Sequence, residues 1–171
     1  MTIEEVYLPY ERAMLLKQKH EQLQRLEEMC RCKISFAEGN LIQIEGEGYD
    51  AYVTKEVVFA FGRGFGLRTA ELLLKDDYYF SSIDIKGLQG SKKRVLNIKS
   101  RLIGTDGRAK KYIEGVSSAH IAVYGDTICF IGSVAAISEA ETAAKTIING
   151  GSHRLAYKRM EAAHRKNKNS A

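Results

Sequence analysis

The stretch Ile103-Gly104-Thr105-Asp106-Gly107-Arg108 lies between two segments with helical periodicity, and the interpretation of the whole chain begins there. Glycine has no side chain, so a turn with a glycine at each end lets another molecule come close to main-chain atoms. The helix after such a turn presents unpaired N–H groups and the positive end of its dipole, which favour a phosphate. The turn Gly104–Gly107, called the glycine turn below, therefore predicts contact with a sugar-phosphate backbone.

The spacing of apolar residues predicts the elements around the glycine turn. It indicates a strand near residues 80–85, a helix ending at Gly104, a second helix after Gly107, two strands joined by a hairpin at Gly125-Asp126, and a closing helix over 135–148. This order of strand, helix, turn, helix, strand, strand and helix resembles a type I KH domain. In that α+β fold the glycine turn clamps the backbone of single-stranded RNA.

An internal repeat extends the prediction to the first half of the chain. A shift of 87 residues aligns the two halves without a gap, pairing Leu26 with Ile113, Met29 with Val116, Ile34 with Ile121, Phe36 with Val123, Leu41 with Ile128 and Ile44 with Ile131. We therefore expect two tandem type I KH domains that pack together, each a three-stranded sheet with three helices, plus a C-terminal helix. The predicted parts are a degenerate KH domain with an extra connecting helix (1–75), a KH domain with an intact turn (76–151), and a basic helix and tail (152–171), frayed from Arg165.

The repeat also shows where the two halves differ. The glycine turn aligns with Lys17–His20, which contains no glycine, so the first domain is predicted to lack the clamp. Lys17 and Lys19 are either phosphate contacts or solvated surface lysines. Residues 1–90 contain 11 Lys and Arg against 15 Asp and Glu, a net charge of −4, whereas residues 91–171 contain 15 against 6, a net charge of +9. A polyanionic partner is therefore expected for the second half only.

Basic and apolar residues near the glycine turn complete the predicted site. Cations would bind phosphates, and an apolar floor from the preceding helix and the following strand would carry the bases. The predicted RNA-binding residues are Ile98, Arg101, Leu102, Ile103, Gly104, Thr105, Asp106, Gly107, Arg108, Lys110, Lys111, Ile121, Ala122 and Val123, with possible support from Lys92, Lys93, Arg94 and His153. Asp106 opposes binding, by about 1 kcal/mol or less at an exposed position. His153 is first interpreted as a structural contact, one helical turn before Tyr157.

Other features of the sequence argue against several classes of function. Cys30, Cys32 and Cys129 lack the spacing of a zinc site and are expected to be buried as small apolar residues. The histidines form no triad with a nucleophile and an acid, so we expect no catalytic residues, no metal and no cofactor. The chain has no apolar run long enough for a bilayer and no signal peptide, which predicts a cytoplasmic protein without membrane contact.

A closer resemblance covers almost the whole chain. The residues that carry it are Ala60–Phe65, Asp76–Tyr79, Ile83–Ile85, Ser91–Arg94, Arg101–Gly107 and Gly151–Tyr157. Together they resemble the archaeal members of a two-KH-domain family of pre-rRNA processing proteins, relatives of the eukaryotic partner of the small-subunit rRNA dimethyltransferase and of the PIN endonuclease that matures the rRNA 3′ end. The resemblance implies a ribosome-biogenesis factor that binds the single-stranded 3′ region of small-subunit rRNA. It also implies contacts with that endonuclease or dimethyltransferase and with the translation initiation factor alpha subunit. A protein adaptor with secondary RNA contact is the alternative.

Overall fold

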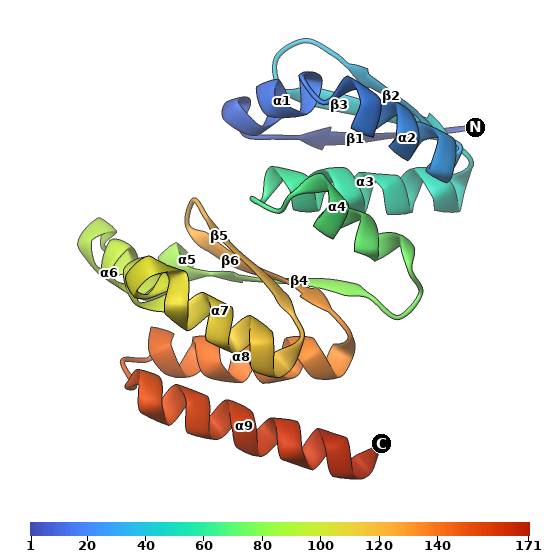
Figure 1. The fold of residues 1–171 in the computed structure, drawn as a ribbon. Helices are drawn as coiled ribbons and strands as arrows, with labels where there is room; N and C mark the ends of the chain where they lie inside the picture. The colour runs from blue at the N-terminus through green and yellow to red at the C-terminus, as the bar shows by residue number, and fades with distance from the viewer. The chain divides into compact units, whose positions relative to one another are not determined.

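The computed structural model describes residues 1–171, apart from the side chain of Gln89. The chain forms two compact units, Met1–Asp76 and Asp77–Ala171, each built on its own three-stranded antiparallel sheet (Figure 1). Because each unit has its own sheet and helices, the predicted α+β class with two KH-type arrangements is confirmed.

The first unit has the strand and helix order expected for a KH domain. It contains β1 (Thr2–Tyr7), α1 (Tyr10–Lys17), α2 (His20–Cys30), β2 (Lys33–Phe36), β3 (Leu41–Gly46), α3 (Gly48–Gly62), α4 (Leu67–Ala70) and the 3-10 helix η1 (Glu71–Leu74). β3 is the central strand, with β1 and β2 on either side of it, and Ile34 lies opposite Ile44. The expected connecting helix over Gly66–Lys75 is divided into α4 and η1.

The second unit repeats the arrangement and adds two helices. It contains β4 (Tyr79–Asp84), α5 (Ile85–Gln89), α6 (Lys92–Ile103), the 3-10 helix η2 (Thr105–Gly107), α7 (Arg108–Ser117), β5 (His120–Tyr124), β6 (Thr127–Gly132), α8 (Val134–Ile148) and α9 (His153–Ser170). β6 is central, and the core lies between the sheet and helices α6, α7 and α8. Ala156 and Met160 of α9 are fully buried in the same core, so this helix is an integral part of the unit.

A hydrogen bond to the edge strand and a left-handed helix cap occur in both units at the predicted spacing of 87 residues. Glu27 Oε1 accepts the Ile34 N–H at 2.6 Å, and Glu114 Oε1 accepts the Ile121 N–H at 2.8 Å. Each carboxylate thereby occupies an N–H on the outer strand of its sheet, where an unpaired backbone group could otherwise bind a foreign strand. The left-handed caps Arg31 (φ 53°) and Ser118 (φ 66°), which follow α2 and α7, show the same spacing.

The gap-free alignment is wrong for the first strand of each unit. β1 begins at Thr2 and β4 at Tyr79, an offset of 77 residues, because α5 and its flanking residues are inserted between β4 and α6. Ile85, predicted in the strand, instead begins α5, because the Asp84 carboxylate accepts the Gly87 N–H at 3.0 Å and caps that helix. The prediction of a frayed tail is also wrong, since α9 continues to Ser170.

Candidate nucleic-acid interface

The glycine turn is exposed and has a backbone that only glycine adopts readily. α6 ends at Gly104 (φ 75°, ψ 174°), and Asp106 (φ 54°) and Gly107 (φ 74°) both have left-handed geometry. Thr105 and Asp106 are exposed, while the two glycines are partly exposed. The sequence therefore predicted both the position of the turn and its accessibility.

The two glycines have different physical reasons to lack a side chain. A Cβ on Gly104 would lie 2.7 Å from both the Cβ and the backbone nitrogen of Ala109, the second residue of α7. A Cβ on Gly107 would meet only the flexible Lys111 side chain, at 3.9 Å. Gly104 thus allows α6 and α7 to pack at the turn, whereas Gly107 leaves open space on the solvent side. Space of that kind is what a phosphate needs to approach the backbone.

The start of α7 is open to an anion. Ser91, Ser133 and Ser152 cap α6, α8 and α9 with hydroxyls that each accept the backbone N–H of the third residue of the helix. Gly107 precedes α7 and contributes no such side chain. The Arg108 N–H, the first of α7, donates to the Thr105 carbonyl oxygen, so the turn presents an anion mainly with the positive end of the α7 dipole.

The predicted cations divide into structural and available groups. The Arg101 guanidinium donates to the carbonyl oxygens of Ile147, at 3.1 Å, and Gly151, so it closes the C-terminal end of α8. Lys110 is 3.7 Å from the Glu114 carboxylate and is half-buried. The predicted cations whose side chains remain exposed are Lys92, Lys93, Arg94, Arg108 and Lys111. These five can reach a ligand without breaking an internal contact that the structure records.

The predicted apolar floor is mostly inside the unit. Ile98, Leu102, Ile121 and Ala122 are between 1% and 7% exposed. Ile103 is 36% exposed, and Val123 is partly buried against the core. The α6 side chains that face the sheet are needed for packing, so a base can touch only the edge of this surface. The buried residues hold that surface in place.

His153 joins α9 to the end of α6. Its Nε2 is 2.7 Å from the Arg101 carbonyl oxygen, and its ring lies 6.0 Å from the Tyr157 ring. The Tyr157 ring is 4.4 Å from the Tyr112 ring of α7, and the Tyr112 hydroxyl donates to Glu161. His153 is therefore a structural contact that braces the helix leading into the glycine turn.

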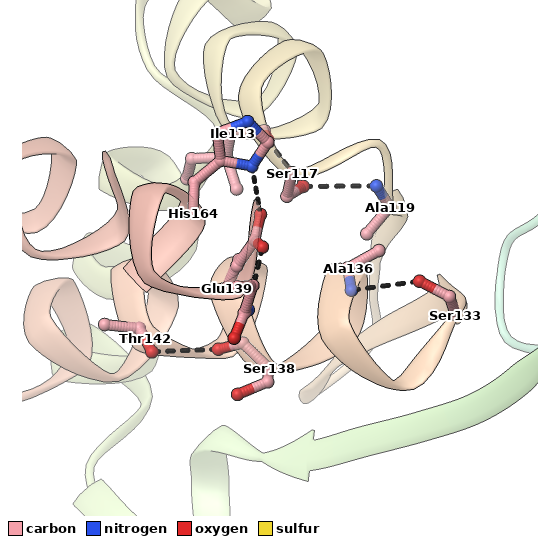
Figure 2. Close-up of polar contacts among 10 residues, drawn as sticks. Ile113, Ser117, Ala119, Ser133, Ala136, Ser138, Glu139, Thr142 and His164 are labelled. Carbon is pink, nitrogen blue, oxygen red and sulfur yellow. Dashed lines mark hydrogen bonds and ion pairs between the residues drawn. The ribbon is translucent and has the colours of Figure 1, made fainter. Parts of the chain in front are cut away.

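A buried carboxylate that the sequence analysis missed fixes the other end of α9. Glu139 is 3% exposed on α8, and one of its oxygens lies 2.9 Å from His164 Nδ1 (Figure 2). Its other oxygen lies 2.9 Å from Asn167 Nδ2. The surrounding side chains drawn in Figure 2, such as Ser117, bond to nearby backbone groups. The signal was a lone acidic residue on the apolar side of an alanine-rich helix. We interpret this contact as structural because it joins two packed helices.

The corresponding turn of the first unit has ordinary backbone geometry. Gln18 (φ −77°) and Lys19 (φ −94°) connect α1 to α2 with no left-handed residue between them. The Lys17 ammonium lies 5.3 Å from the centre of the Phe36 ring, within reach of a cation–π contact. This turn therefore lacks the open backbone of the glycine turn.

The remaining sequence predictions concern the cysteines and the membrane. Cys30, Cys32 and Cys129 are all buried, as predicted, and burial raises the pKa of the Cys30 thiol. Among the described residues, no helix combines the length and the apolar character that crossing a bilayer would require.

The second unit matches the model of a known domain family. Residues 79–165, half of the chain, match the model of the second KH domain of PNO1, a eukaryotic type KH domain (KH-domain type I). A KH domain-containing protein of Methanocaldococcus jannaschii is 33% identical over 112 residues, which are 66% of this chain and 49% of that protein. The match thus spans about half the length of that curated relative.

Solved structures match nearly the whole chain. Dim2p from Pyrococcus horikoshii has a TM-score of 0.84 and 29% identity, with 95% of this chain and 99% of that chain covered. A chain in the crystal structure of the a/eIF2alpha-aDim2p-rRNA complex from the same organism has a TM-score of 0.87 and 27% identity, covering 96% and 95%. A protein of unknown function from Aeropyrum pernix has a TM-score of 0.91, covering 99% and 94%, but at 24% identity it supports the fold alone.

Proposed function

Because the chain belongs to the PNO1/Dim2-like family of type I KH-domain proteins, we propose that it is an RNA-binding assembly factor for the 3′ region of small-subunit rRNA. The glycine turn carries the proposal. It combines an open backbone at Gly107, an uncapped α7 and exposed cations on both neighbouring helices. The aDim2p complex, which contains rRNA, supports the choice of ligand.

In this proposal the residues around the turn have separate roles. A phosphate lies against the open backbone at Gly107, at the positive end of the α7 dipole, while Arg108 and Lys111 neutralise its charge. A base lies against the exposed edges of Ile103 and Val123, which Ile98, Leu102 and Ile121 support from beneath. Arg101 and His153 hold the end of α6 and do not contact RNA, because both are engaged with the backbone. The neutral Thr105 and the acidic Asp106 leave the cations of the flanking helices to supply the affinity.

The test is RNA binding by Gly107→Asp, measured by fluorescence anisotropy with a labelled fragment of the host rRNA 3′ end at two salt concentrations. Aspartate tolerates left-handed geometry, so the variant should fold. A carboxylate about 4 Å from a phosphate costs about 1 kcal/mol even in bulk water, so we expect affinity to fall about fivefold or more. Equal affinity of the variant and the wild type would refute the proposal.

Gly39→Asp is the matched control. Gly39 also has a positive φ of 71°, its Cβ position is open, and it lies between β2 and β3 of the first unit. The control therefore introduces the same charge at another glycine with positive φ, in the unit that lacks the glycine turn. If both variants lost affinity equally, net charge and not the glycine turn would explain the loss.

A second candidate function, that of a protein adaptor, is favoured by the first unit. Its turn lacks glycine, its half of the chain is acidic, and the aDim2p relative was crystallised with a/eIF2alpha as well as rRNA. We propose the initiation factor alpha subunit as a partner, and the maturation endonuclease or the dimethyltransferase as others. Calorimetric titration of each host protein into the full chain, with and without the RNA fragment, tests this role. An absence of heat with every partner would argue against it.

A further inference from the structure

A cavity of about 300 Å³ lies beside the N-terminal half of α6. Its lining residues are Lys86, Gly90, Lys92, Val95, Leu96, Lys99 and Asp126. Lys92 alone among these belongs to the RNA-binding set predicted from the sequence. We call this cavity the α5–α6 pocket, because α5 and the residues after it form one wall and α6 forms another.

The insertion specific to the second unit builds the pocket. The first unit passes from β1 to α1 through Leu8 and Pro9, whereas the second unit places α5 between β4 and α6. The Ile85 N–H donates to the Asp126 carbonyl oxygen at 2.8 Å, which ties the start of α5 to the hairpin between β5 and β6. The pocket wall is therefore fixed to the same sheet that carries the proposed RNA site.

One face of α6 connects the pocket to the glycine turn. Lys92, Leu96, Lys99 and Ile103 are spaced by four, three and four residues. At about 100° per residue, their directions from the helix axis fall within an arc of about 60°. At about 1.5 Å per residue, this stripe is about 16 Å long, and its last residue directly precedes Gly104. A strand held at the turn and following α6 would therefore enter the pocket.

The chemistry of the pocket suits a nucleotide. Three ammonium groups are available to phosphate oxygens, and Leu96, which is 64% exposed, presents an apolar side chain between Lys92 and Lys99. Apolar surface beside cations fits a flat base attached to a phosphate. The Asp126 carboxylate disfavours a bare anion, but it can accept a hydrogen bond from an amino group on a base.

We infer that the α5–α6 pocket binds a further nucleotide of the same RNA strand, beyond the four that a KH turn holds. This inference rests on the proposed function of the glycine turn. It commits the pocket to RNA, because the stripe leads to the turn and the lysines complement a polyanion.

The test compares Leu96→Glu with wild type on a tetranucleotide and on an RNA of about eight nucleotides, which exceeds the four held by the turn. We expect Leu96→Glu to weaken the longer RNA about tenfold, through the lost apolar contact and the added charge, and to leave the tetranucleotide unchanged. Leu88→Glu is the matched control, because Leu88 is 63% exposed on α5 but does not line the pocket. Both leucines are exposed, so neither variant should disturb the core.

A second measurement separates phosphate contact from general repulsion. The double variant Lys86→Gln and Lys99→Gln should bind the longer RNA with a weaker salt dependence. The slope of log binding constant against log salt concentration should become shallower by about 0.7 for each lost phosphate contact. The tetranucleotide should keep its slope. Millimolar inorganic phosphate should not abolish the preference of the wild type for the longer RNA, because Asp126 disfavours binding of a free anion in the pocket.

The outcomes distinguish this inference from the proposed function. Equal effects of Leu96→Glu and Leu88→Glu on the longer RNA, with Gly107→Asp still impairing both RNAs, would overturn the pocket and leave the turn intact. Equal loss on both RNA lengths would place Leu96 within the four-nucleotide site and would also overturn a separate subsite. Unimpaired binding by Gly107→Asp would refute the proposed function itself.

Discussion

Replacing each glycine of the glycine turn by alanine should have unequal effects on stability. At Gly104 the added Cβ would lie 2.7 Å from two atoms of Ala109, and the backbone has φ 75° and ψ 174°, a combination that is rare outside glycine. Backbone strain of this kind costs about 2 kcal/mol, and overpacking adds about 2 kcal/mol. We therefore expect Gly104→Ala to lower the free energy of unfolding of the second unit by about 4 kcal/mol.

At Gly107 the same change meets no close atom. Its φ of 74° and ψ of 14° lie in the left-handed helical region, where an alanine costs about 1 kcal/mol. Gly107→Asn should cost still less, because asparagine tolerates this geometry. From the most to the least stable, the expected order is wild type, Gly107→Asn, Gly107→Ala and Gly104→Ala.

Urea unfolding combined with amide hydrogen exchange at α6 and α7 measures this order in the full chain, because local exchange reports the second unit separately. Losses for Gly104→Ala and Gly107→Ala that agree within about 0.5 kcal/mol would refute the assignment of different roles. The difference also explains why Gly107 is the position for testing RNA binding. A variant of Gly104 would confuse lost folding with lost contact.

Two further predictions concern the attachment of α9. Glu139→Ala should lower the free energy of unfolding by about 2 kcal/mol, because the bonds of this buried acceptor to His164 and Asn167 disappear. Thermal unfolding measures the loss, and amide hydrogen exchange in α9 should become faster. A loss below about 0.5 kcal/mol would contradict the prediction. The hydrogen bond to Glu161 raises the pKa of Tyr112, and burial raises the pKa of Tyr157, so the folded protein holds both phenolic protons more tightly than the unfolded chain. The resulting stability is present below the ordinary tyrosine pKa of about 10 and is lost as pH rises through the higher folded values. Tyr112→Phe should therefore reduce the fall in melting temperature between about pH 9 and pH 11, and an unchanged fall would contradict this attribution.

The sequence predicted those parts of the fold that depend on local periodicity. The helices on either side of the glycine turn, the hairpin at Gly125-Asp126 and the closing helix all recur as expected, because a buried face imposes its spacing on the residues that form it. α5 was missed because five residues are too few to show a helical period. The start of α5 depends on Asp84, which is also the last residue of β4. The hydrogen bond by which Asp84 caps the helix cannot be inferred from the sequence pattern.

The site was less predictable because spacing does not say which groups a side chain contacts. Arg101 has the charge and position of a phosphate ligand, but it donates to two carbonyls at the end of α8. The first unit contains a comparable arrangement, in which the Arg12 guanidinium donates to the carbonyls of Phe61 and Phe65 at the end of α3. Such long-range contacts join residues about 50 positions apart, so no local pattern reveals them.

The division of roles between the two units follows from which features they share. Both units keep the arginine that closes the helix after the central strand, α3 or α8, and the carboxylate that occupies the edge-strand N–H, and these features stabilise the fold. The second unit alone has the glycine turn, the inserted α5 and the excess of cations. The first unit folds without these three features, and the face of α6 that carries Lys92 and Lys99 connects the α5–α6 pocket to the glycine turn. A common ligand explains their occurrence together. Under the function proposed here, a strand of RNA is a ligand that would use all of them.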